Sequence, residues 1–286
     1  NRMSLQADSD IGITTATGLG AGLEIYPGFV RVGGAATENV RFEVTGRSDL
    51  IDNSMDYEGQ PKLPHKNVAA GMYGDFRSQS GGPNLSCDTL IKGQSVDFII
   101  RGEKETHAAA MWADFTSKHR VEADTVSMNV TTSGTGDAHG MMAECWDVRW
   151  GVPGHNTVTA GTVRIHAESE YQGAFGMMAT NPDFGGGVYS AAGSSNTITS
   201  EGALDLEITA RADNGYAWAM YAESRRGDAT WHNRYLIPGT SSSRDGTPEK
   251  IVRSVGAYAP ACRMNTIPTG AGTASIPRSG VVRVDG

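Results

Sequence analysis

Five segments of the chain alternate apolar and polar residues with a period of two. In the clearest segment, Val126, Met128 and Val130 are separated by the polar residues Ser127 and Asn129. A period of two predicts a β-strand with one buried face. The other segments with this pattern lie at residues 40–44, 96–100, 163–167 and 204–210. Because no segment keeps a helical period for long, the alternation predicts an all-β chain.

A second kind of segment follows each alternating strand and contains a central methionine. These segments are apolar at nearly every position, and they lie at residues 70–73, 110–113, 140–143, 176–179 and 219–222. Phe98 precedes Met111 by 13 residues, and Met128 precedes Met141 by 13. The same spacing is 12 and 14 residues in the next two units but 30 in the first. We therefore expect an insertion loop at residues 46–66, since long loops cost little stability.

The repeated methionines predict a packed column. They occupy the same place in successive units at positions 72, 111, 141, 177 and 220. Methionine fills irregular gaps in a core well, so stacking is favoured over a cofactor or metal site. The small residues just before them, such as Ala110 and Gly140, are expected on the opposite face of the strand, beside Trp112 and Met142. There they would let another layer approach closely.

These units predict an all-β repeat β-solenoid, either a right-handed parallel β-helix or a β-roll. One unit has too little core to fold alone, so like units must bury their faces on one another. A β-propeller is the alternative, because a unit of about 40 residues could form one blade. Only two strands per unit are clear. The expected organisation is an N-terminal cap or partial repeat at residues 1–37, solenoid repeats at 38–224, and an irregular C-terminal region at 225–286 with a terminal strand.

Composition and charge exclude two classes of partner from the expectation, nucleic acids and a membrane span. The chain has 37 glycines and a formal net charge of -8. Without a cluster of Lys and Arg it lacks the basic face that phosphate binding needs, so no nucleic-acid partner is expected. No apolar run reaches the roughly 18 residues that span a bilayer, so no membrane span is expected either.

The cysteines and histidines give no clear chemical site. Cys87, Cys145 and Cys262 lie far apart and form no CxxC, which leaves free thiols or one bridge open and disfavours zinc. The seven histidines are dispersed, as surface or turn histidines usually are; His107 and His139 precede methionine-centred segments. We therefore expect no catalytic, cofactor-binding or metal-binding residues.

Two acidic features have structural explanations. Asp205 and Glu207 point to the same face of one strand, and such a pair could hydrolyse a glycan, but solvated acidic residues explain it equally well. Gly136-Asp137, Asn181-Pro182-Asp183 and Asp213-Asn214-Gly215 resemble calcium loops only loosely, and ordinary turn chemistry accounts for them.

One tripeptide is a candidate binding loop. Arg226, Gly227 and Asp228 form an Arg-Gly-Asp sequence just after the last clear repeat. If exposed, it could engage integrins. Because three-residue matches arise readily by chance, a solvated turn is the favoured interpretation.

The repeat resembles a known family. An Asn-Thr-Val-Thr or Asn-Thr-Ile-Thr opener at residues 156–159 and 196–199 is followed by an alternating strand and then by an Ala- and Gly-rich methionine segment. This combination resembles the passenger domains of bacterial autotransporters over roughly residues 38–223. The three cysteines are a departure, because such passengers usually carry fewer.

The resemblance implies an extracellular or bacterial cell-surface protein without enzymatic activity, which acts as an adhesin or structural scaffold. Its partners would be a host or matrix surface glycan or protein, or other copies of itself. One alternative is a self-assembling extracellular filament or surface-layer subunit. The other is a β-helix enzyme that processes polysaccharides.

Overall fold

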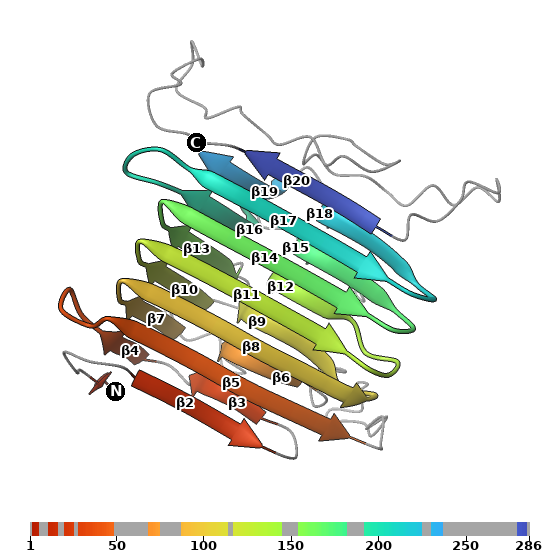
Figure 1. Cartoon of the computed structure of the whole chain (residues 1–286), viewed down its shortest axis with the longest axis horizontal. Helices are drawn as coiled ribbons and strands as arrows, with labels where there is room; N and C mark the ends of the chain where they lie inside the picture. Colours follow the sequence, from red (N-terminus) through yellow and green to blue (C-terminus); the bar gives the residue numbers. More distant parts are fainter. Residues whose placement is uncertain are drawn as a thin grey trace, which may run out of the picture.

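The structure is a computed structural model. It describes residues 2–5, 11–16, 20–25, 28–48, 68–74, 87–113, 117–144, 154–181, 192–224, 230–236 and 279–284. The regular elements in this part of the chain are all β-strands, and they stack coil upon coil from the N-terminal to the C-terminal end (Figure 1). The described strands thus confirm the all-β prediction.

The strands form three sheets, which we name A, B and C. Sheet A contains β1 (Arg2–Leu5), β4 (Gly28–Gly33), β7 (Cys87–Lys92), β10 (Ser117–Glu122), β13 (His155–Thr159), β16 (Ala192–Thr199) and β19 (Thr230–Leu236). Sheet B contains β2 (Ile11–Ala16), β5 (Asn39–Ser48), β8 (Ser95–Lys104), β11 (Thr125–Thr132), β14 (Thr162–Ser169), β17 (Asp205–Ala212) and β20 (Ser279–Val284). Sheet C contains β3 (Gly20–Ile25), β6 (Val68–Gly74), β9 (His107–Ala113), β12 (Ala138–Glu144), β15 (Gly173–Asn181) and β18 (Tyr216–Ser224).

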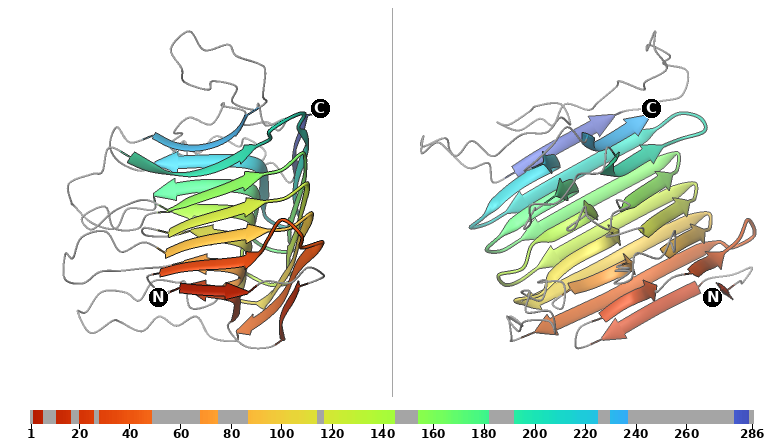
Figure 2. Two further views of the ribbon diagram at one scale, coloured as in Figure 1. Left: turned by 90° about the vertical axis from the view of Figure 1, so that its left-hand side faces the viewer. Right: turned by 180° about the vertical axis from the view of Figure 1, so that it is seen from behind.

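Each coil visits the three sheets in the order A, B, C, and the next coil stacks on it in parallel. For example, β7, β8 and β9 form one coil, and β10, β11 and β12 pair with them strand for strand. Figure 2 shows the resulting stack from the side and from behind. This arrangement is a parallel β-solenoid, as the repeat predicted, and it excludes the propeller alternative, whose blades would be separate sheets.

The structure corrects the number of strands in each unit. Each of the six coils from β1 to β18 has three strands, because the short strand of sheet A precedes the two that the pattern revealed. The Asn-Thr-Val-Thr opener is part of β13, and the Asn-Thr-Ile-Thr opener lies in β16. The N-terminal segment at residues 1–37 contains β1–β4, which pair in parallel in the same three sheets. The expected insertion at 46–66 lies outside the described residues from position 49 on.

Alternation along sheet B separates the core from solvent. In β11 the residues Val126, Met128 and Val130 are buried, and their polar neighbours face outward. The same residues of adjacent coils meet inside the solenoid, where the rings of Phe42 and Phe98 stack at 4.8 Å. One continuous apolar cluster therefore runs from β4 to β18. Like side chains at successive coils bury one another, which no single coil could do.

The methionine column is confirmed, but its small neighbours lie on an unexpected face. Met72, Met111, Met141, Met177 and Met220 are all buried in the core cluster. Ala110 belongs to this same cluster, whereas Trp112 packs in a second cluster outside sheet C. Residue 110 and its equivalents are skipped in the pairing of each coil with the next. We conclude that a local irregularity turns two consecutive side chains inward, so simple alternation failed here.

The turn from sheet C to sheet A is held by a buried polar column. Thr89, His119, Asn156 and Asn196 occupy the same position in successive coils. Asn156 Nδ2 donates to the carbonyl of Met142 at 2.7 Å, and Asn196 Nδ2 donates to that of Met178 at 2.7 Å. These bonds satisfy carbonyls that the bend would leave buried and unpaired. The asparagine of the opener is therefore explained by hydrogen bonding.

The last strand described closes one edge. β20 pairs antiparallel with β17, and Val282 lies opposite Ile208. This covers the C-terminal edge of sheet B with a strand of opposite direction. Between β19 and β20, residues 237–278 lie outside the part of the chain that the structure describes. Among the described residues there is no helix long and apolar enough to cross a membrane.

Candidate functional site

Among the described residues, most ion pairs lie on the outward face of sheet B. Its solvent-facing positions align across coils, so that Arg41 lies beside Asp97 and Arg164 beside Glu207. Arg101 bonds Glu43 across the strands at 3.4 Å. Such exposed pairs contribute little stability, typically below about 1 kcal/mol each. Their effect is to fix the directions of long side chains on a broad polar surface.

One strand of this face differs from its neighbours. The outward residues of β11 are short and uncharged: Ser127, Asn129 and Thr131, followed by Ser133 in the turn. The aligned residue of β8 beside Thr131 is Arg101, and that of β14 is Glu168. Two long charged side chains therefore flank a short one, which leaves a hollow between them.

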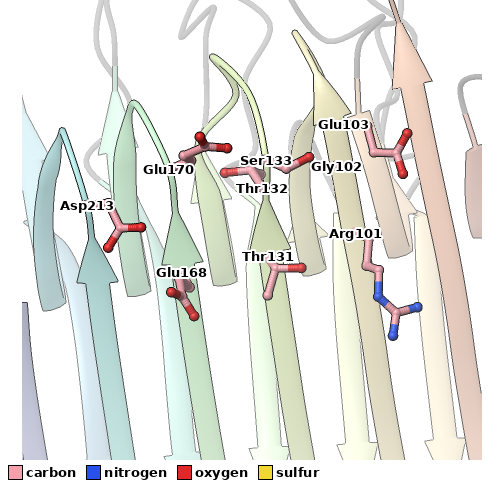
Figure 3. Close-up of a pocket in the computed structure, with 9 residues that line it drawn as sticks. All are labelled: Arg101, Gly102, Glu103, Thr131, Thr132, Ser133, Glu168, Glu170 and Asp213. Atoms are coloured by element: carbon pink, nitrogen blue, oxygen red, sulfur yellow. The ribbon is translucent and has the colours of Figure 1, made fainter.

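The hollow is a cavity of about 290 Å³ at the end of β11 (Figure 3). Its lining comes from four successive coils, at the ends of their sheet B strands and in the turns that lead from sheet B to sheet C: Arg101, Gly102, Glu103, Thr131, Thr132, Ser133, Glu168, Glu170 and Asp213. Arg211 holds the carboxylates of Glu168 and Asp213 at 3.7 and 2.9 Å. The wall thus presents oriented carboxylates, hydroxyls and one guanidinium to the opening.

The acidic pair that was weighed as a glycosidase candidate, Asp205 and Glu207, lies beside an arginine. Arg164 forms an ion pair with the Asp205 carboxylate and donates to the Asp205 carbonyl at 3.0 Å. Its Nε lies 4.0 Å from the Glu207 carboxylate. The hydrogen bond from Arg164 holds the pKa of Asp205 below its usual range, against the opposing effect of burial and with the help of the arginine's charge. A glycosidase acid needs a raised pKa, whereas a lowered pKa suits only the other carboxylate of such a pair, the nucleophile or base.

A second group of polar residues lies at the N-terminal ends of two neighbouring strands of sheet C, β9 and β12. His107, Asp137 and His139 offer ligand atoms that all lie within 4.8 Å of one another. His107 Nδ1 is 3.5 Å from Asp137 Oδ2 and accepts a hydrogen bond from the Asp137 main-chain N–H at 3.0 Å. The other carboxylate oxygen accepts from the Gly173 N–H at 2.7 Å. The carboxylate is therefore fixed from two sides.

Burial sets the charge of this cluster. His139 is 2% exposed, and burial lowers its pKa to about 4, although the nearby Asp137 carboxylate acts to raise it. Burial alone would raise the pKa of Asp137, but the contact with the His107 side chain, the nearby His139 imidazole and the hydrogen bond from the Gly173 N–H outweigh it and lower the pKa. At neutral pH the buried imidazole is therefore neutral and the carboxylate is ionised.

Two of the histidines are buried, although the sequence suggested surface or turn positions. The expectation of surface or turn positions is wrong for His119 and His139, which are both buried. His119 faces the interior because it takes the inward position on β10 that asparagine takes in β13. His139 lies on the outer side of sheet C between Trp112 and Phe175. The side chains of His65 and His232 lie outside the described residues.

The cluster carried a signal that sequence inspection missed. His107 precedes Met111 by four residues, and Asp137 precedes Met141 by four. Pairing of β9 with β12 therefore places them in adjacent coils at one position. Asp137 was weighed as a calcium-loop residue and interpreted as a turn residue, and His139 was interpreted as a dispersed histidine before a methionine segment. Aligning the units on their methionines would have brought all three together.

Other candidate residues cannot be placed. Arg226, Gly227 and Asp228 lie outside the described residues, as do Cys145 and Cys262. Cys87 is the first residue of β7, and its side chain is not described. The integrin-binding prediction and the pairing of the cysteines therefore stay predictions.

The fold and these two sites define the chain as a parallel β-solenoid with a polar outer face. Comparison with known proteins adds no relative: no protein-family model, no curated protein and no solved structure matches the chain.

Proposed function

We propose that the chain is a non-enzymatic binding scaffold, whose sheet B face holds an extended polar ligand, foremost a surface glycan. The observation that carries this proposal is the row of short polar side chains on β11 with the cavity at its end. A ligand lying along this strand would meet hydroxyl and amide groups below it and charged groups on either side. Hydroxyls, carboxylates and guanidinium groups supply both donors and acceptors for the hydroxyls of a sugar.

Rigidity supports the same proposal. The residues proposed to bind along β11 stand on the three paired strands β8, β11 and β14, with the core of the solenoid directly beneath them. Groups held on strands lose little freedom when a ligand binds, which lowers the entropic cost of association. Two carboxylates of the wall, those of Glu168 and Asp213, are also restrained by Arg211.

The location is a separate part of the proposal. An extracellular or cell-surface position, and the role of adhesin, are supported by the resemblance of the repeats to autotransporter passenger domains. Fractionation of the source cells with an antibody against the chain tests this part. Recovery in the medium or in the surface fraction is expected, and recovery only with cytosolic proteins would contradict it.

The binding proposal is tested by filling the cavity. Thr131→Arg places at β11 the residue that β8 already carries at the aligned position, Arg101, so the strand should tolerate it. Thr157→Arg is the matched control, because Thr157 lies on β13 of sheet A beside Arg120. Both variants add the same side chain and charge to a solvent-facing position next to an arginine.

The measurement is binding of the purified chain to an array of glycans and matrix proteins. We expect the wild-type chain and the Thr157→Arg variant to bind the same targets, and Thr131→Arg to bind them at least about tenfold more weakly. Equal binding by both variants would contradict a site on β11. Absence of binding by the wild-type chain, together with filaments seen by electron microscopy, would favour the self-assembling alternative.

A further inference from the structure

The cluster at the start of sheet C is assembled from two adjacent coils. His107 opens β9, and Asp137 occupies the equivalent position just before β12. His139 lies two residues further along β12 and aligns with Ala109 below and with Phe175 above. The three side chains thus converge only because the two coils stack in register. Neither coil alone holds more than two of them.

One atom of the cluster lacks a partner. His139 Nδ1 is buried and has no hydrogen-bond partner. The ring itself is fixed, since it stacks on Phe175 at 5.1 Å and meets the edge of Trp112 at 5.6 Å. A buried polar atom without a partner costs free energy, so its persistence calls for a ligand. The adjacent carboxylate and second imidazole indicate that this ligand is a cation.

The donor set selects a class of ion. Two imidazole nitrogens and one carboxylate oxygen are typical ligands of zinc and other divalent transition metals, whereas calcium and magnesium prefer oxygen ligands throughout. We propose that His107, Asp137 and His139 bind one divalent transition metal ion, with Zn²⁺ as the probe. This differs from the expectation drawn from the sequence, which found no paired ligands.

The cluster is open to solvent on one side, and its carboxylate is held in place by a main-chain N–H, as an ion site requires. The side chains of His107 and Asp137 are 27% and 24% exposed, so an ion can enter from solvent while His139 closes the inner side. The Gly173 N–H fixes one oxygen of Asp137, which is the outer contact that a ligating carboxylate usually has. A Cβ at Gly173 would lie 2.8 Å from Asp137 Oδ1, so glycine leaves room for the carboxylate.

Binding requires a small contraction. Ligand atoms around tetrahedral zinc are about 3.3 Å apart, given metal–ligand distances of about 2.0–2.1 Å. His107 Nδ1 and Asp137 Oδ2 are already 3.5 Å apart, and the most distant pair of the cluster must close from up to 4.8 Å. A metal at His107 Nδ1 would replace the hydrogen bond from the Asp137 N–H. With three protein ligands, the fourth position is left to water or another donor.

The test titrates Zn²⁺ into the purified, chelator-treated chain and measures binding by calorimetry. His139→Phe introduces the residue that the next coil carries at this position, Phe175, and His107→Val introduces that of the preceding coil, Val68. Both should therefore fold, which circular dichroism checks. The matched control is His155→Ser, which copies Ser195 from the next coil outside the cluster.

We expect one Zn²⁺ per wild-type chain and unchanged binding by His155→Ser. Each cluster variant should bind at least about tenfold more weakly, since even changes outside the ligand shell cost that much. Co²⁺ should give a visible spectrum of nitrogen and oxygen ligands that His139→Phe abolishes. Absence of binding by the wild-type chain would overturn the proposal. So would full binding by the folded cluster variants, or a thiolate charge-transfer band that assigns the ion to cysteine.

Discussion

His119 should make the stability of the solenoid depend on pH. Its ring is fully buried in the turn from sheet C to sheet A, with Nε2 3.0 Å from the Trp112 carbonyl and Nδ1 3.3 Å from Thr89 Oγ1. Nε2 therefore carries a proton and donates to the carbonyl, while Nδ1 accepts from the threonine. Both bonds are made by the neutral ring. Burial lowers its pKa from 6.5 to about 4, despite the hydrogen bond to Trp112, which acts to raise it.

The sign of the effect follows from proton uptake. Below pH 6.5 the unfolded chain binds a proton at this residue, and the folded chain does not until the pH approaches 4. Stability from the neutral ring is thus complete above pH 6.5 and is lost as the pH falls toward 4. The slope is at most about 1.4 kcal/mol per pH unit, so the loss between pH 7.5 and 4.5 is about 2 kcal/mol.

The variant His119→Asn isolates this contribution. The aligned residues Asn156 and Asn196 already donate to the equivalent carbonyls at the end of the preceding coil, so asparagine suits the position but does not titrate. Urea unfolding should be measured for both chains from pH 7.5 to 4.5, because groups common to both cancel in the difference. We expect the stability of the wild-type chain to fall by about 2 kcal/mol more than that of H119N. Parallel pH profiles would refute the reasoning.

Two further substitutions test the interior. Gly140→Ala should destabilise the chain by about 1–3 kcal/mol in thermal unfolding, since a Cβ there would overlap the Ile165 side chain. The control Gly202→Ala, with no atom within 4 Å of its Cβ, should change stability by less than about 0.5 kcal/mol in the same assay. Asn156→Leu should lower the free energy of unfolding in urea by about 1–3 kcal/mol, because it leaves the buried Met142 carbonyl without this donor. An unchanged urea midpoint would show that the polar column contributes nothing to stability.

The sheet B and sheet C strands could be predicted because their side chains follow simple rules. Val126, Met128 and Val130 alternate with polar residues, and in four units a methionine follows the centre of the alternating strand after 12 to 14 residues. The sheet A strands were missed because they are short and turn polar side chains inward: in β13 the buried positions include Asn156. Period-two patterns detect apolar faces, so a strand whose buried residues hydrogen-bond to a bend gives no such signal.

The sites were hidden for a different reason. The cavity exists because Thr131 stands between Arg101 and Glu168, and these residues are far apart in sequence. The inward turn of Ala110 likewise depends on an irregularity that composition does not reveal. To predict such features one must know the register between coils, that is, which residue of one strand lies opposite which residue of the next. The pattern within one unit shows only that a strand is present and which of its faces is buried.

Register also explains where this solenoid can carry specific chemistry. Stacking favours like residues at equivalent positions, as the buried methionines and asparagines show. A coil that departs from its neighbours therefore forgoes that stacking, and the departure marks a place where another interaction compensates. Thr131 between charged side chains and His139 between Ala109 and Phe175 are two such departures. Restoring the neighbour's residue should remove binding while it preserves or improves the fold. A variant that loses both together would show that these residues serve the stack itself and not a ligand.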